Sequence, residues 1–154
     1  MIKIQCDKNF INILRRFFSL LPIEAEINFF STSECDICIL RDEFLPERFI
    51  PSSKFILINS DDSKLIKRLG TVRSRVITCG LSTRSTATLS SISENKGVVC
   101  LQRSLVDLTG KKHPQFELPF ELSGKIIDDV SVIMIIISAL LCGANISQLN
   151  KIYL

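Results

Sequence analysis

The chain has no tryptophan, one histidine and six glycines among its 154 residues, and no glycine precedes Gly70. A loop that wraps a phosphate group needs glycines, because a Cβ restricts the backbone and hinders its N–H groups from approaching the phosphate. The first strand-like run is followed by CDKNFINIL, which contains Lys8 but no glycine, and Gly-Lys-Ser/Thr occurs nowhere in the chain. The sequence therefore predicts that a triphosphate is not held by the usual phosphate-binding loop.

Charge, cysteine content and hydropathy exclude other classes of protein. The net charge of +3 is scattered, without the stripe of cations that neutralises nucleic acid, so no nucleic-acid partner is expected. The apolar run 130–144 is shorter than the ~20 residues that span a bilayer, and we expect a core helix and no membrane span.

No secretory signal precedes the six cysteines, which we interpret as reduced core thiols of a cytoplasmic protein. Cys35 and Cys38 form a C-x-x-C pair without two further ligands, so no metal site is predicted; strand alternation would place them on opposite faces.

The hydrophobic periodicity predicts one α/β domain over residues 1–154, with a mostly parallel sheet flanked by helices. Strands are expected at 1–5, 24–30, 35–40, 54–59 and 75–80, and helices at 9–21 and 62–70. A small antiparallel meander follows at 86–103 and 115–122, where Pro119 predicts an edge strand or a free N–H side. A long apolar C-terminal helix at 130–144 covers the sheet, and Ser147 is expected to cap a final short helix.

The stretch FILINSDDSKLIKRLG, residues 55–70, takes an apolar strand into an amide and two carboxylates. One interpretation is capping, because Asp and Ser side chains accept hydrogen bonds from the first turn of a helix. The other is a ligand site, because open α/β sheets bind ligands at the carboxyl ends of their strands. Asn59, Asp61 and Asp62 are the residues on which the two interpretations differ.

The order of these elements resembles the central, ATP-binding domain of the Mur ligases, which form amide bonds at the expense of ATP. The resemblance covers residues 35–149. INSDD at 58–62 is similar to the family's strand ending in N-x-D-D, and VITCGL at 76–81 is similar to its next strand. The resemblance implies that Asn59 and Asp61 or Asp62 contact the adenine and ribose of ATP, so these three are the candidate cofactor-binding residues.

The chain departs from the family pattern at several places. The phosphate-binding loop is absent, Ile126 and Ile127 replace a His-Asn pair, and Asp42 and Glu43 stand where other polar residues are expected. The domains that bind the acceptor and the amino acid have no room in 154 residues. We therefore predict no catalytic residue and no cofactor, with ATP and Mg²⁺ as the alternative.

Three functions are weighed. The first is a non-catalytic, degenerate Mur-ligase-like domain that acts as a binding or regulatory module, linked to cell-envelope metabolism, with a protein partner. The second is a minimal nucleotide-dependent ligase or hydrolase that uses Asn59, Asp61, Asp62 and Lys8. His113, in a turn rich in cations, is expected to be a solvated surface residue instead of a catalytic one. The third is a structural subunit of an oligomer or larger assembly, in which the apolar helix packs against a partner chain.

Overall fold

The computed structural model describes residues 1–42, 51–124 and 127–153. Its first half contains β1 (Ile2–Cys6), α1 (Lys8–Phe18), β2 (Ala25–Phe29), β3 (Cys35–Leu40), β4 (Ser53–Asn59), α2 (Ser63–Leu69) and β5 (Arg75–Cys79). Its second half contains β6 (Ala87–Ser93), β7 (Lys96–Leu101), β8 (Leu105–Val106), β9 (Lys112–His113), β10 (Phe116–Ser123), α3 (Asp129–Leu141), a 3-10 turn (Ile146–Gln148) and β11 (Lys151–Tyr153).

Nine of the described strands form one sheet in the order β11-β10-β7-β6-β5-β4-β3-β1-β2, and β8 pairs with β9 in a small antiparallel hairpin. The strands from β2 to β6 run parallel, whereas β7 is antiparallel to both β6 and β10. The predicted α/β class, with a mostly parallel sheet flanked by helices, is confirmed. The antiparallel meander is also present, because β6, β7 and β10 are joined in this way.

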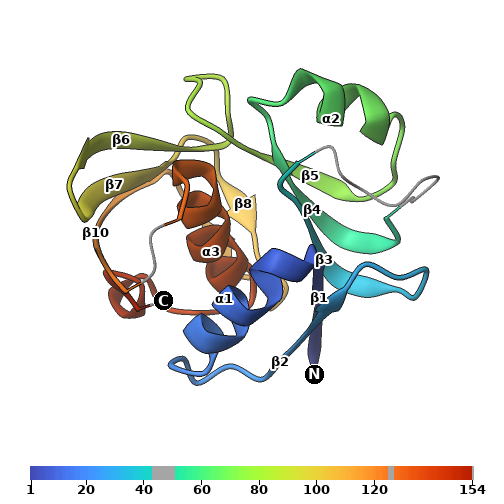
Figure 1. Cartoon of the computed structure of the whole chain (residues 1–154), viewed down its shortest axis with the longest axis horizontal. Helices are drawn as coiled ribbons and strands as arrows, with labels where there is room; N and C mark the ends of the chain where they lie inside the picture. Colours follow the sequence, from blue (N-terminus) through green and yellow to red (C-terminus); the bar gives the residue numbers. More distant parts are fainter. Residues whose placement is uncertain (43–50, 125–126, 154) are drawn as a thin grey trace.

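The three helices cover the sheet unequally (Figure 1). α1 and α3 lie side by side on one face, and the curled strands β6, β7 and β10 wrap around α3. This face holds the larger core, to which α1, α3 and all the central strands contribute. α2 covers the other face alone, over a smaller cluster that includes Leu40, Ile58 and Leu65. One face of the sheet is therefore much better covered than the other.

α3 is almost entirely enclosed by its own chain. Twelve of its 13 residues are buried, and its interior polar groups have partners, since Ser138 Oγ donates to the Ile135 carbonyl at 2.8 Å. The structural-subunit hypothesis assigned this helix to a partner chain, whereas the sheet and α1 already bury it. No helix in the described part of the chain is both long enough and apolar enough to cross a membrane.

The ends of several elements differ from the prediction. α1 ends at Phe18 instead of residue 21, and turn hydrogen bonds follow it, with Leu20 N donating to the Phe17 carbonyl at 3.1 Å. α3 ends at Leu141 instead of residue 144, and the chain ends in strand β11 instead of a helix. The final turn is preceded by Asn145, whose N–H donates to the Gln148 side chain, so the predicted cap at Ser147 is wrong.

Pro119 lies at a position of β10 where no neighbouring strand needs a hydrogen bond from a backbone N–H. On β10, Leu122 N donates to Asn95 O on the β7 side, and Glu121 N donates outward to Asn150 O. Strand alternation then places the nitrogen of Pro119 on the outward side, beyond the short ladder that β11 forms with Glu121–Ser123. The prediction that the N–H side of this strand is free at Pro119 is confirmed.

The cysteines of the C-x-x-C pair do not separate as predicted. Cys35 and Cys38 both pack in the smaller cluster on the α2 face, because Cys35 opens strand β3 and departs from the alternation of its interior. All six cysteines of the chain are free. Among the described residues, no group of three or more His, Cys, Asp or Glu side chains is placed to hold a metal ion.

Candidate functional site

The candidate site lies at the carboxyl ends of the parallel strands. The strand order reverses between β1 and β3, because the chain passes from β1 to β2 on one side and from β3 to β4 on the other. Such a switch point is where open α/β sheets usually bind ligands. α1 and α3 both begin at this edge, and their N-caps are Asp7 and Asp128.

Asn59 ends β4 and ties two loops together. Its Nδ2 donates to the carbonyl oxygen of Arg41 at 3.1 Å, and its Oδ1 accepts from Asp61 N at 3.0 Å. The amide side chain thus connects the end of β3 with the turn after β4. Both of its polar atoms make hydrogen bonds within the protein.

Asp61 holds the loop that follows β5. Its carboxylate accepts from Leu81 N at 2.9 Å and 3.2 Å. This contact requires a glycine beside it, because a Cβ built on Gly80 would lie 2.6 Å from Asp61 Oδ1 and 2.6 Å from Ser60 Oγ. The carboxylate therefore joins the ends of β4 and β5.

Asp62 caps α2, as the first interpretation of the stretch predicted. Its Oδ1 accepts from Lys64 N and from Leu65 N, each at 3.1 Å. A cap of this kind satisfies N–H groups that have no partner within the helix. Gly70 ends the same helix with a φ of +61°, which confirms the predicted C-terminal signal. The structure thus brings Asn59, Asp61 and Asp62 to one edge of the sheet, each bound to neighbouring backbone.

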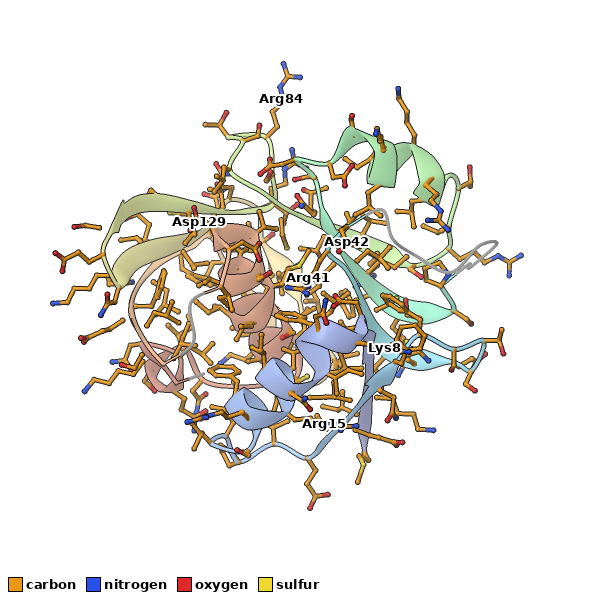
Figure 2. All side chains as sticks on the ribbon, in the orientation of Figure 1. Lys8, Arg15, Arg41, Asp42, Arg84 and Asp129 are labelled. Carbon is orange, nitrogen blue, oxygen red and sulfur yellow. The ribbon has the colours of Figure 1, made fainter. Side chains whose placement is uncertain are left out.

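A charged cluster that the sequence did not reveal occupies the switch point. Arg41, directly after β3, donates from Nε to Asp7 Oδ2 at 2.8 Å and from Nη2 to Asp7 Oδ1 at 2.9 Å. Its Nη1 donates to Ser131 Oγ at 2.9 Å and lies 3.8 Å from Asp128 Oδ1. The guanidinium also stacks 4.3 Å from the ring centroid of Phe10. Figure 2 shows Arg41 beside the start of α1, between that helix and α3.

The cluster joins the starts of two helices. Asp7 Oδ1 also accepts from Phe10 N in the first turn of α1, and Asp128 accepts from the backbone and hydroxyl of Ser131 in the first turn of α3. Burial lowers the pKa of Arg41, but the hydrogen bonds and charge of Asp7, with the charges of Asp128 and Asp42, outweigh it and raise that pKa. The guanidinium therefore stays charged, and its charge is largely balanced by these carboxylates.

Lys8, assigned to the site in the enzyme hypothesis, follows Asp7 at this edge and extends toward the end of β2. Its Nζ lies 5.2 Å from the centroid of the Phe29 ring, over β2. Ile127 lies before α3 and supplies no hydrogen-bonding side chain there. Glu43 and Ile126 lie outside the described residues.

His113 is buried, not solvated, so that prediction is wrong. It is 4% exposed, and its Nε2 lies 2.7 Å from Asp107 Oδ2. Burial raises the pKa of Asp107, but hydrogen bonds from Thr109, His113 and Lys111 outweigh it and lower that pKa overall. The pair closes the β8–β9 hairpin, where the next residue, Leu108, donates its N–H to Leu141 at the carboxyl end of α3. It thus lies at the opposite end of α3 from the Arg41 cluster.

No family model and no curated protein matches this chain. The likeness to the Mur ligases therefore rests on the motifs of the sequence. What the structure adds is the set of contacts made by the residues that those motifs single out.

Proposed function

We propose that this chain is a non-catalytic binding or regulatory module built on a scaffold like the central domain of the Mur ligases. The observation that carries the proposal is the bridge from Arg41 to Asp7, Ser131 and Asp128 at the switch point. In an active nucleotide site, this edge offers free backbone N–H groups and cationic charge to a polyphosphate. Here the chain's own carboxylates accept one first-turn N–H of each helix, from Phe10 and Ser131, and pair with the charge of Arg41.

The electrostatics of the bridge oppose a polyphosphate. Asp7 already accepts from the first turn of α1 and balances the charge of Arg41. A phosphate oxygen about 4 Å from either N-cap carboxylate would experience up to about 4 kcal/mol of repulsion from that charge, which the pairing with Arg41 reduces. Asn59, Asp61 and Asp62 each hold a backbone group of the chain, which leaves them fewer positions with which to contact a nucleotide.

The proposal includes a cytoplasmic location, and the environments of the cysteines suit it. Burial raises the pKa of Cys6 to about 12, with a smaller contribution from the charge of Asp7, and burial likewise raises the pKa of Cys35 to about 11. Thiols with such pKa values stay protonated at neutral pH and react slowly. They act as apolar core residues and suit a reducing compartment.

Calorimetric titration with ATP, in the presence and absence of Mg²⁺, tests the proposal. We expect no saturable binding to the wild-type chain at millimolar ATP. The same titration of Asp7→Asn/Asp128→Asn, which keeps oxygen acceptors at both N-caps but removes their charge, shows whether carboxylate repulsion is the obstacle. Tight Mg²⁺-dependent binding to the wild type, lost in Asp61→Asn, would contradict the proposal and favour the nucleotide-dependent enzyme.

A further inference from the structure

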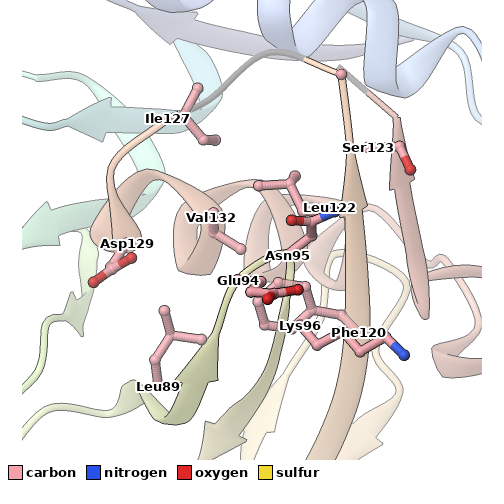
Figure 3. Close-up of a pocket in the computed structure, with 11 residues that line it drawn as sticks. Leu89, Glu94, Asn95, Lys96, Phe120, Leu122, Ser123, Ile127, Asp129 and Val132 are labelled. Atoms are coloured by element: carbon pink, nitrogen blue, oxygen red, sulfur yellow. The ribbon is translucent and has the colours of Figure 1, made fainter.

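A cavity of about 500 Å³ lies between the β6–β7 hairpin, the end of β10 and the start of α3 (Figure 3). Its apolar lining comes from β6, β10, α3 and the segment before α3. The side chains that form this lining are Leu89, Phe120, Leu122, Ile127 and Val132. This volume falls within the ~300–1,000 Å³ typical of sites for small organic molecules, which are mostly apolar with a few polar groups.

Backbone contacts fix the position of the hairpin beside the cavity. Leu122 N donates to Asn95 O at 2.7 Å, which fixes the turn of the hairpin to β10. Glu94 turns the chain with a φ of +54°, and the β6–β7 ladder shifts register between Ser90 and Ser93. These features bend the hairpin away from a simple ladder beside the cavity.

Two carboxylates and one amine line the cavity, and they lie at different places around it. Glu94 and Asp129 both line it, and neither carboxylate has a hydrogen-bond or ion-pair partner within the described part of the chain. Asp61, Asp62 and Asp128, in contrast, all accept hydrogen bonds from backbone N–H groups. In Figure 3 the amine of Lys96 lies on the side of the cavity away from Asp129. The cavity therefore offers an apolar interior with two carboxylates and one amine at its border.

We propose that this cavity binds a small molecule that has an apolar, ring-sized body and a protonated amine. The body would fill the space among Leu89, Phe120 and Val132, and the amine would meet the Glu94 carboxylate, with Asp129 on the other side of the cavity. The inference rests on the proposed function, for which it names a class of ligand. No covalent step is involved, and the cavity uses none of Asn59, Asp61 or Asp62.

Three probes with one aromatic body test the charge preference: 1-naphthylmethylamine, 1-naphthalenemethanol and 1-naphthoate. Titration followed by amide NMR shifts is expected to give affinity in the order amine, alcohol, carboxylate, with the shifts centred on Leu89, Leu122 and Val132. Since an exposed ion pair contributes up to about 1 kcal/mol, the Glu94 carboxylate should change the amine affinity about fivefold.

Variants separate charge from cavity filling. Glu94→Gln should weaken the amine about fivefold and leave the alcohol unchanged. Glu117→Gln, on the exposed part of β10 outside this cavity, is the matched control and should change neither. Leu89→Trp should fill the space and abolish binding of all three probes while the protein stays folded, as judged by its NMR spectrum.

The outcomes distinguish this proposal from the proposed function. If no probe binds the wild type, or if the carboxylate binds as well as the amine, the ligand site is refuted while the absence of ATP binding still supports a non-catalytic module. Tight ATP binding at the strand ends would contradict the non-catalytic module whichever probe binds the cavity.

Discussion

Replacing Arg41 should destabilise the protein more than replacing any exposed arginine. Arg41→Ala removes two hydrogen bonds to Asp7 and one to Ser131, and it leaves Asp7 with a side chain only 18% exposed and without its cation. Hydrogen bonds to charged groups contribute about 1.5–3 kcal/mol each when buried, and partial exposure reduces this. With the stacking on Phe10 adding about 0.5–1 kcal/mol, we expect a total loss of about 3 kcal/mol.

Urea unfolding followed by circular dichroism measures this loss. Arg84, which points into solvent in Figure 2, supplies the control, and Arg84→Ala should change the free energy of unfolding by less than about 0.5 kcal/mol. Arg41→Lys should recover less than half of the loss, because lysine cannot hold a carboxylate through two parallel hydrogen bonds.

A double-mutant cycle between Arg41 and Asp7 should give a coupling energy of about 2 kcal/mol. The reasoning is refuted if Arg41→Ala costs no more than Arg84→Ala, or if the coupling to Asp7 is zero within error. Either result would mean that the bridge contributes little to holding the starts of α1 and α3 together.

Three further predictions concern other parts of the fold. Gly80→Ala should cost about 1 kcal/mol in urea unfolding by displacing the Asp61 carboxylate, and the loss should shrink in an Asp61→Ala background. The lowered pKa of Asp107 contributes stability that is complete above its unfolded-state pKa of about 3.9 and is lost as the pH falls through the lower folded-state value. Asp107→Asn should therefore flatten the acid side of a pH–stability curve, and an unchanged slope would contradict this. In alkylation with iodoacetamide followed by mass spectrometry, half-buried Cys100 should react first and Cys6 among the last, so early labelling of Cys6 would oppose the account.

Local sequence signals predicted much of the fold. The strand alternation, the apolar helix period, Gly70 and the capping position of Asp62 depend on neighbours a few residues apart, and the structure contains them. The end of α1 was misplaced, because an apolar residue beyond a helix end can still pack in the same direction as the helix face. β11 was missed, because three residues carry too little pattern to identify a strand.

The Arg41 cluster could not be predicted in this way. Its contacts join residues 34 and 90 positions apart, and the sequence offers no pairing signal over such separations. Each of the three charged members follows or precedes a predicted element, so a list of charged residues at the ends of predicted strands and helices would have contained Asp7, Arg41 and Asp128. The prediction for His113 is wrong for a similar reason. Its cationic neighbours in the sequence indicated exposure to solvent, whereas the fold places Asp107 against its ring.

A crystal structure determined with Mg²⁺ and ATP at millimolar concentration tests the central claim most directly. The account predicts that Arg41 keeps its two hydrogen bonds to Asp7, with no phosphate at the start of α1. Phosphate oxygens bound by the main-chain nitrogens of Cys6 to Phe10, with Arg41 displaced from Asp7, would contradict it.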